Sequence, residues 1–451
     1  MKRAIAALIF VLTAASALSF TAPSGNRISG DVIPGDGTAS SICTENVDYD
    51  TYFTHERLRL DFILAGDSRH QYAFLEELHK ECAWAGSPNG LIDRTGFGQY
   101  FFEAFSGDRL IYSKGFSTLF EEWRTTARAS EVPMASGQTM WMPFPKDSIS
   151  VVMYQRVRAT GKFEKIFECK VDPRDRHIIP VPDNDFKVVP LQYKGDMAHK
   201  VDLVFSGEAY TSAQLPKLHD DAIRMMEYMF TMEPYAHRRD DFNVWLIESI
   251  SDDGSVDIPQ NGQWCSTVMD SGFDTFYEDR YLTVWNHKKI AQVYSGAPFD
   301  ALYVIANETK YGGGGIYNSY AMGSSDHAAS LPVFIHEFGH SFAGLGDEYY
   351  DSSVAYEDYY PLDVEPWEPN ITTMVDFGSK WKDMVKKGTP VPTPNDPKKY
   401  YGVTGVFEGG GYMAKGVYRP YYECRMLNNT APCFCPVCQR AIENMIDFYV
   451  K

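Results

Sequence analysis

The first half of the chain shows the alternation of apolar and polar residues that is typical of β-strands. In the segment RLRLDFIL, apolar Leu58, Leu60 and Phe62 alternate with charged residues, as in a strand with one buried face. The segment SISVVMY is rich in β-branched residues, and turn-forming sequences such as GSPNG separate the candidate strands. Short strands joined by such turns predict an antiparallel β-sandwich, which we place at residues 46–190.

The pattern changes near residues 180–195, after which strand and helix patterns alternate. The segment KVDLVFSGEAY predicts a strand ending at Gly207, and DFNVWLIESI and ALYVIAN predict two more buried strands. Between them, LPKLHDDAIRMMEYMF predicts an amphipathic helix. Its expected apolar stripe contains Ile223, Met226, Met229 and Phe230. We expect these methionines to fill the core rather than bind a metal, and we assign residues 191–451 to an α/β domain.

The N-terminal end has the layout of a secretory signal peptide. Lys2 and Arg3 precede an apolar run, and a small-x-small site follows at residues 15–17. The apolar run is shorter than the ~20 residues that span a bilayer, so we expect cleavage after residue 17 rather than a transmembrane anchor. Residues 18–45 are rich in Gly, Ser, Thr and Pro and are expected to form a flexible tether. The predicted location is periplasmic or extracellular.

The formal net charge of −18 argues against one class of partner. A protein that binds nucleic acid needs a basic surface to neutralise phosphates. We therefore expect no nucleic-acid partner.

A further helix is predicted to begin near Ser330. Pro332 fits its first turn, because the opening amides of a helix have no intrahelical partner. Phenylalanines at positions 334, 338 and 342 are spaced four apart and predict the face that packs on the core.

Another face of this helix carries the sequence H-E-x-x-H. His336 and His340 lie one turn apart, so both imidazoles can reach one cation, for which zinc is the usual choice. Glu337 is placed to act as general base on the attacking water, and not as a ligand. Zinc lowers the pKa of water to ~7 and polarises a carbonyl group. The predicted reaction is hydrolysis of a peptide bond, with one catalytic zinc ion per chain.

Several longer motifs carry a family resemblance. SVDIP, GGGGIYNSYA, HEFGHSFAGLGDEY, GGGYMAKGVYRPYYECRML and FCPVC together resemble the IgA-peptidase family of zinc metallopeptidases, relatives of the metzincins. These motifs cover roughly residues 250–440, and the preceding β-rich region is similar to the N-terminal domain of that family. The resemblance implies a metzincin-like α/β zinc-peptidase domain, a zinc cleft and a C-terminal subdomain closing it.

The third metal ligand has three candidates. Many metzincins place a glycine three residues after the second histidine and the ligand three residues later, but that register offers no ligand here. With one residue inserted, Gly344 becomes the turning glycine, in a left-handed conformation, and Asp347 the ligand. Glu348 is the second candidate, with an alternative role orienting a histidine. A downstream glutamate, Glu365 or Glu368, is the third.

The resemblance also implies a methionine turn beneath the metal. The sequence CRM indicates Met426 for this turn, with Met413 as the second choice. Tyr418 and Arg419 are candidates for the substrate cleft, where an arginine could bind a substrate carboxylate. The glycines at 312–315 suit a sheet edge or a loop beside the substrate channel.

Eight cysteines in an exported chain favour disulfides. Half of them crowd the C-terminus, at positions 424, 433, 435 and 438. A four-thiolate zinc site is the competing interpretation of this group. On the grounds of redox compartment we expect disulfides and no zinc there.

Two functions from different classes follow from the sequence. The leading hypothesis is a secreted zinc endopeptidase that acts on proteins or peptides, with host or glycosylated proteins among the candidate substrates. The alternative is a glycan- or surface-protein-binding module in which the β-sandwich binds and the metal domain is inactive or structural. The intact Glu337 favours the enzyme, since a structural zinc site needs no general base.

Overall fold

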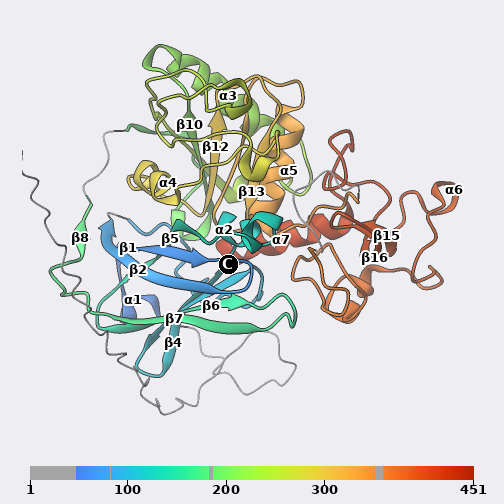
Figure 1. Cartoon of the computed structure of the whole chain (residues 1–451), viewed down its shortest axis with the longest axis horizontal. Helices are drawn as coiled ribbons and strands as arrows, with labels where there is room; N and C mark the ends of the chain where they lie inside the picture. The colour runs from blue at the N-terminus through green and yellow to red at the C-terminus, as the bar shows by residue number, and fades with distance from the viewer. Residues whose placement is uncertain (1–46, 82, 182–185, 351–358) are drawn as a thin grey trace, which may run out of the picture. The chain divides into compact units, whose positions relative to one another are not determined.

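A computed structural model describes residues 47–81, 83–181, 186–350 and 359–451 of the chain (Figure 1). The predicted signal peptide at 1–17 and tether at 18–45 lie outside the described residues. Among the described helices, none combines the length and the apolar character needed to cross a membrane.

Two four-stranded sheets form the N-terminal part, with the orders β5-β1-β2-β8 and β4-β3-β6-β7. Their strands are β1 Phe53–Gly66, β2 Gln71–Glu81, β3 Tyr100–Ser106, β4 Arg109–Phe116, β5 Met134–Pro145, β6 Ile149–Arg156, β7 Phe163–Val171 and β8 Ile179–Pro180. Short helices lie at α1 (Tyr49–Tyr52) and α2 (Leu119–Trp123). Leu58, Phe102 and Val151 from both sheets are fully buried in one shared core. The predicted sheet-rich N-terminal region is therefore confirmed.

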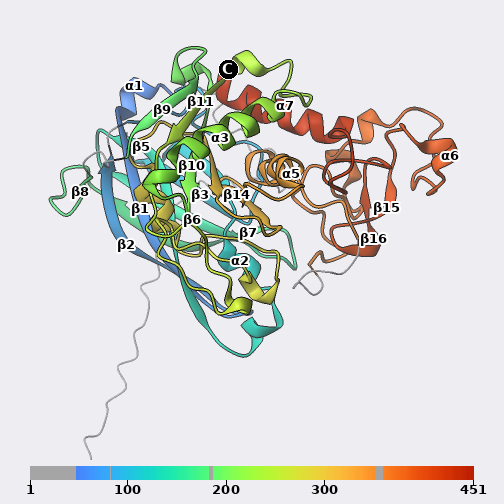
Figure 2. The ribbon, with the colours of Figure 1, turned by 90° about the horizontal axis from the view of Figure 1, so that it is seen from above.

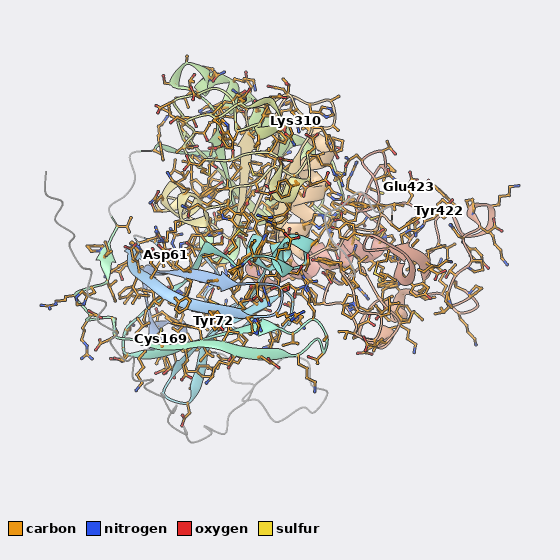
Figure 3. The ribbon with its side chains drawn as sticks, in the orientation of Figure 1. Asp61, Tyr72, Cys169, Lys310, Tyr422 and Glu423 are labelled. Carbon is orange, nitrogen blue, oxygen red and sulfur yellow. The ribbon has the colours of Figure 1, made fainter. Side chains whose placement is uncertain are left out.

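The charged face of β1 is buried as well as its apolar face, which the alternation alone did not indicate. Arg57 Nε lies 2.6 Å from Glu81 Oε2, and its Nη2 donates to the carbonyl of Ser295 at the end of α4 (His287–Tyr294). Arg59 pairs with Asp61 at 2.7 Å. Figure 3 labels Asp61 on this sheet. Because these charged side chains are paired with one another, this face of β1 can be buried against the end of α4.

A six-stranded mixed sheet of order β13-β14-β12-β10-β11-β9 organises the rest of the chain. Its strands are β9 Val188–Gln192, β10 Val201–Glu208, β11 Phe242–Ile247, β12 Ala301–Ala306, β13 Gly313–Ile316 and β14 Tyr320–Ser324. The four central strands run parallel, and β13 and β9 are antiparallel edge strands. The mixed α/β organisation is confirmed, whereas the metzincin-like arrangement stays a prediction. The predicted boundary at residue 190 falls inside β9, and the division at that residue also stays a prediction.

Three helices share the core on one face of this sheet: α3 (Leu215–Met229), α5 (Ser330–Ala343) and α7 (Pro436–Val450). Figure 1 shows α5 beside β13, and Figure 2 shows it nearly end-on between β14 and the C-terminal segment. That segment carries α6 (Pro397–Tyr400) and the hairpin of β15 (Phe407–Gly410) and β16 (Met413–Arg419).

The apolar stripe of α3 differs in part from the predicted one. Met226 and Met229 are buried in the core, as expected, but Ile223 is 44% exposed. The buried face instead includes Ala222 and Met225. Because successive helical residues are about 100° apart, a face centred near Ala222 turns its neighbour Ile223 toward solvent.

Candidate metal centre and active site

Helix α5 positions the candidate catalytic residues as the sequence predicts. It begins at Ser330 with Pro332 in its first turn, and Phe334 and Phe338 are fully buried in the core. The helix ends at Gly344, whose φ of +63° lies in the left-handed region that favours glycine. The chain therefore reverses at once and returns the following residues to the histidine face.

Three donor atoms converge at the C-terminal end of α5. His336 Nε2 and His340 Nε2 are 3.1 Å apart, and Asp347 Oδ1 lies 2.9 Å from the first and 3.2 Å from the second. Zinc with bonds of ~2.0–2.1 Å in tetrahedral geometry needs ligand atoms about 3.3 Å apart. The triangle therefore has the size that one zinc ion requires.

Both imidazoles are oriented by backbone carbonyls. The Nδ1 atom of His336 lies 3.1 Å from the carbonyl oxygen of Arg425, and that of His340 lies 2.5 Å from the carbonyl oxygen of Leu345. A carbonyl only accepts a hydrogen bond, so each Nδ1 carries the proton. In the neutral form of each ring, the Nε2 lone pair is therefore the one that can bind a metal.

The charges of the site favour a cation between these groups. Burial alone would raise the pKa of Asp347, but the two imidazoles hold it well below its ordinary value of 3.8. Burial likewise would lower the pKa of His340, which the Asp347 carboxylate raises to about 9. The buried Oδ1 of Asp347 faces the two imidazole nitrogens, while its Oδ2 accepts from the hydroxyl of Tyr412. These observations fit a bound metal cation.

Glu337 lines a cavity of about 350 Å³ together with both histidines and Asp347. Burial raises the pKa of its carboxyl group. Edge strand β13 lies against it so closely that a Cβ atom on Gly315 would stand 2.2 Å from the Glu337 carbonyl oxygen. Glycines 313–315 also line the cavity. Of the two positions predicted for the glycine run, residues 313–315 therefore take the sheet edge.

The other candidates for the third ligand lie elsewhere. Glu348 Oε1 accepts from Asn370 Nδ2 at 3.0 Å and lies 3.2 Å from Cys438 Sγ. Glu365 Oε2 accepts from the backbone amide of Asp376 at 2.8 Å. Glu368 is buried at the cavity wall but is not among the clustered metal-ligating groups of the described residues. Only Asp347, of the candidates, meets the two histidines.

Met426 packs directly beneath the histidine helix. It is fully buried in the core, and a Cβ atom on Gly339 of α5 would stand 3.1 Å from its Sδ. Its carbonyl accepts from the Glu348 amide at 2.8 Å. Met413, the second choice, is half-buried in β16 against a small separate cluster. Met426 therefore packs against the histidine helix, and its role in a methionine turn stays a prediction.

Neither Tyr418 nor Arg419 is among the residues that line the cavity. Tyr418 pairs with Thr372 through its backbone. Arg419 is buried, and its Nη1 donates to the carbonyls of Glu408 and Gly409 at 3.1 and 2.6 Å. The partners of Arg419 lie within the β15–β16 hairpin. A role for either residue in the substrate cleft stays a prediction.

The predicted disulfides are not confirmed. Cysteines 424, 433, 435 and 438 are free thiols, and no disulfide is present among the described cysteines. The Sγ atoms of Cys424 and Cys438 are 3.7 Å apart, well beyond the ~2.05 Å of a disulfide bond.

Several residues of the cavity were not found by the sequence analysis. Tyr412 bonds to Asp347, and Arg280 lies over the ring of Tyr349 at 5.9 Å. The N-terminal part supplies Glu121 and Arg158, which form an ion pair of 3.1 Å at the cavity wall. No local spacing rule connects these residues to the histidines, because long-range contacts bring them together.

Comparison with known proteins places these features in a family. The family model described as IgA Peptidase M64 matches residues 189–402 and 395–446, and the model described as Peptidase M64 N-terminus matches residues 48–168. The first match includes every residue of the metal triangle and the methionine beneath it. No curated protein matches the chain.

Proposed function

We propose, from the premise that this chain belongs to the IgA peptidase M64 family of metallopeptidases, that it is a secreted, zinc-dependent endopeptidase. The observation that carries the proposal is the convergence of His336 Nε2, His340 Nε2 and Asp347 Oδ1 beside the half-buried Glu337. A histidine pair with one carboxylate is a donor set that suits zinc.

His336, His340 and Asp347 would hold the ion. When bound, zinc supplies a lowered water pKa and polarisation of the substrate carbonyl. Glu337, the residue after the first histidine, accepts the proton of the attacking water and passes it to the departing amine. Its raised pKa suits the return of that proton. The carbonyls of Arg425 and Leu345 keep both imidazoles in the ligating orientation.

The substrates of this proposal are proteins or peptides as a class. The cavity is walled by both parts of the chain, with Glu121 and Arg158 on one side and Tyr311 and Asn429 on another. This shared wall supports a role for the N-terminal part in the peptidase site itself, rather than as a separate glycan-binding module. No residue of the wall singles out immunoglobulin as the substrate.

Export is part of the proposal and rests on the sequence of residues 1–17. N-terminal sequencing of protein produced in its own secretory pathway would find the mature chain beginning at Leu18. A chain that retains Met1 in the exported fraction would contradict it.

An unbiased peptide library tests the activity. The purified mature chain, loaded with zinc, should cleave internal bonds, and sequencing of the products gives the residues preferred on each side of the cut. Glu337→Gln is the control, because it removes the base and keeps all three ligands. We expect a rate loss of at least about 10²–10⁴-fold with the zinc content unchanged.

Two results would overturn the proposal. One is a Glu337→Gln variant that binds no zinc, which would make Glu337 a ligand. The other is full cleavage by the zinc-free chain, or by a chain carrying both His336→Ala and His340→Ala.

A further inference from the structure

A second group of metal-ligating side chains includes Cys424, the neighbour of Arg425, whose carbonyl orients His336. It consists of Glu348, Cys424, Cys435 and Cys438, each with one donor atom within 4.8 Å of the others. All are at most 2% exposed. Cys433, from the same CFCPVC segment, is exposed and is not part of the group.

The distances in this group match a tetrahedral metal site rather than a disulfide. Cys424 Sγ and Cys438 Sγ are 3.7 Å apart. Thiolates bound to one zinc ion at ~2.3 Å in tetrahedral geometry lie about 3.8 Å apart. Cys438 Sγ is 3.2 Å from Glu348 Oε1, near the edge of about 3.5 Å expected between a sulfur and an oxygen ligand of zinc. The Cys435 amide donates to Cys424 Sγ at 3.2 Å, which suits a thiolate.

Glu348 provides an independent indication of a cation. Its side chain is fully buried, and within the described residues its Oε2 has no hydrogen-bond partner. Asn370 donates to the other oxygen, and the nearby Arg419 uses Nη1 on backbone carbonyls. A buried carboxylate left in this condition costs free energy unless a proton neutralises it or a cation approaches it.

We propose that Glu348, Cys424, Cys435 and Cys438 bind a second, structural zinc ion. Four protein ligands would close its coordination sphere, so this ion has no open position for substrate or water. Binding requires deprotonated thiols and releases their protons to solvent.

This second ion would hold the turn that orients the first. Cys424 stands two residues before Met426, and the carbonyl of the intervening Arg425 accepts from His336 Nδ1. From the opposite side, the Glu348 amide donates to the Met426 carbonyl at 2.8 Å. Cys435 and Cys438 add the start of α7. The chain that leads into Cys424 carries Tyr422 and Glu423, labelled in Figure 3 on the C-terminal segment.

Metal content of the zinc-loaded full chain tests the site. We expect two zinc ions per wild-type chain and one in Cys435→Ser. The matched control is Cys433→Ser, two residues away and outside the group, which should keep both. The variant with His336→Ala and His340→Ala should also keep one ion. When this variant is loaded with cobalt in place of zinc, it should show thiolate-to-metal charge-transfer absorption. Cys435→Ser loaded with cobalt should lack that absorption.

The histidine variant separates this inference from the proposed peptidase, because its remaining ion is measured without activity. It also decides the question if Cys435→Ser fails to fold. A wild-type chain with a single zinc, together with a Cys424–Cys438 disulfide in unreduced peptides, would overturn the proposal. So would a histidine variant free of metal and of the cobalt absorption.

Discussion

Asp347 and Glu348 are adjacent in the sequence, yet their carboxylates lie in two different groups of metal-ligating atoms. Asp347 Oδ1 meets His336 and His340, whereas Glu348 Oε1 lies 3.2 Å from Cys438 Sγ. The segment after Gly344 is not helical, so successive side chains can point to opposite sides of the chain. One short segment therefore contributes to both groups.

This division predicts different effects of the two alanine variants. Asp347→Ala should weaken zinc binding at the histidine pair by more than about 100-fold, since loss of an outer partner alone costs 10–100-fold. Glu348→Ala should cost less at that pair. The zinc concentration that restores half of the peptidase activity, measured in zinc buffers, reports affinity at the histidine pair, and the reverse order of the two variants would contradict the ligand assignment.

Tyr412 should act through Asp347. Its hydroxyl donates to Asp347 Oδ2, so Tyr412→Phe should lower zinc affinity at the catalytic pair by about 10–100-fold without removing a ligand. Tyr401→Phe is the matched control, because Tyr401 is exposed and its hydroxyl donates to Glu423, away from the metal triangle. Equal zinc affinities of the two variants would show that the hydroxyl does not support the site.

Gly315 should tolerate no side chain. A Cβ atom would stand 2.2 Å from the Glu337 carbonyl oxygen, so Gly315→Ala must displace β13 or α5. We expect a stability loss of about 1–3 kcal/mol in denaturant unfolding, together with lower peptidase activity. At Gly137 the nearest atom would be 3.4 Å away, an ordinary contact, and Gly137→Ala serves as the control. A Gly315→Ala variant as stable and active as this control would refute the close packing.

Asp61 should make stability depend on pH. Burial alone would raise its pKa, but hydrogen bonds from His79, Arg59 and Thr139 hold it well below the ordinary value of 3.8. A lowered pKa means that the unfolded state binds the proton more tightly, so this stabilisation is present above about pH 4 and is lost as the pH falls below it.

Breaking the buried pair by Asp61→Asn should therefore cost about 3 kcal/mol near pH 7. The difference from the wild type should shrink as the pH is lowered from 5 toward 3, in denaturant titrations at each pH. A difference that does not change with pH would contradict the low pKa of Asp61.

The features of α5 that depend on residues close together in the sequence were predicted correctly. The helix from Ser330, its phenylalanine face and its left-handed end at Gly344 all follow from residues close in sequence. The position of Tyr412 does not, because its bond to Asp347 spans 65 residues. The same holds for the carbonyl of Arg425, which orients His336 across 89 residues.

The features that the sequence did not predict also depend on contacts between distant parts of the chain. The buried charged face of β1 depends on α4, more than two hundred residues away, which no strand pattern encodes. Ile223 was assigned to the apolar face from spacing alone, but the packing of α3 on the sheet decides which face is buried. The prediction of disulfides among cysteines 424, 433, 435 and 438 rests on the oxidising compartment expected for an exported chain. That criterion carries no information on the distances between sulfur atoms.

The most direct test of the metal centre is anomalous X-ray scattering at the zinc edge from crystals of the zinc-loaded chain. We predict a peak bonded to His336 Nε2, His340 Nε2 and Asp347 Oδ1 at ~2.0–2.2 Å, with the Glu337 carboxylate near the ion but not bound to it. A peak at the histidines that takes its carboxylate ligand from Glu348 or Glu337, or no peak at the histidines, would contradict the account.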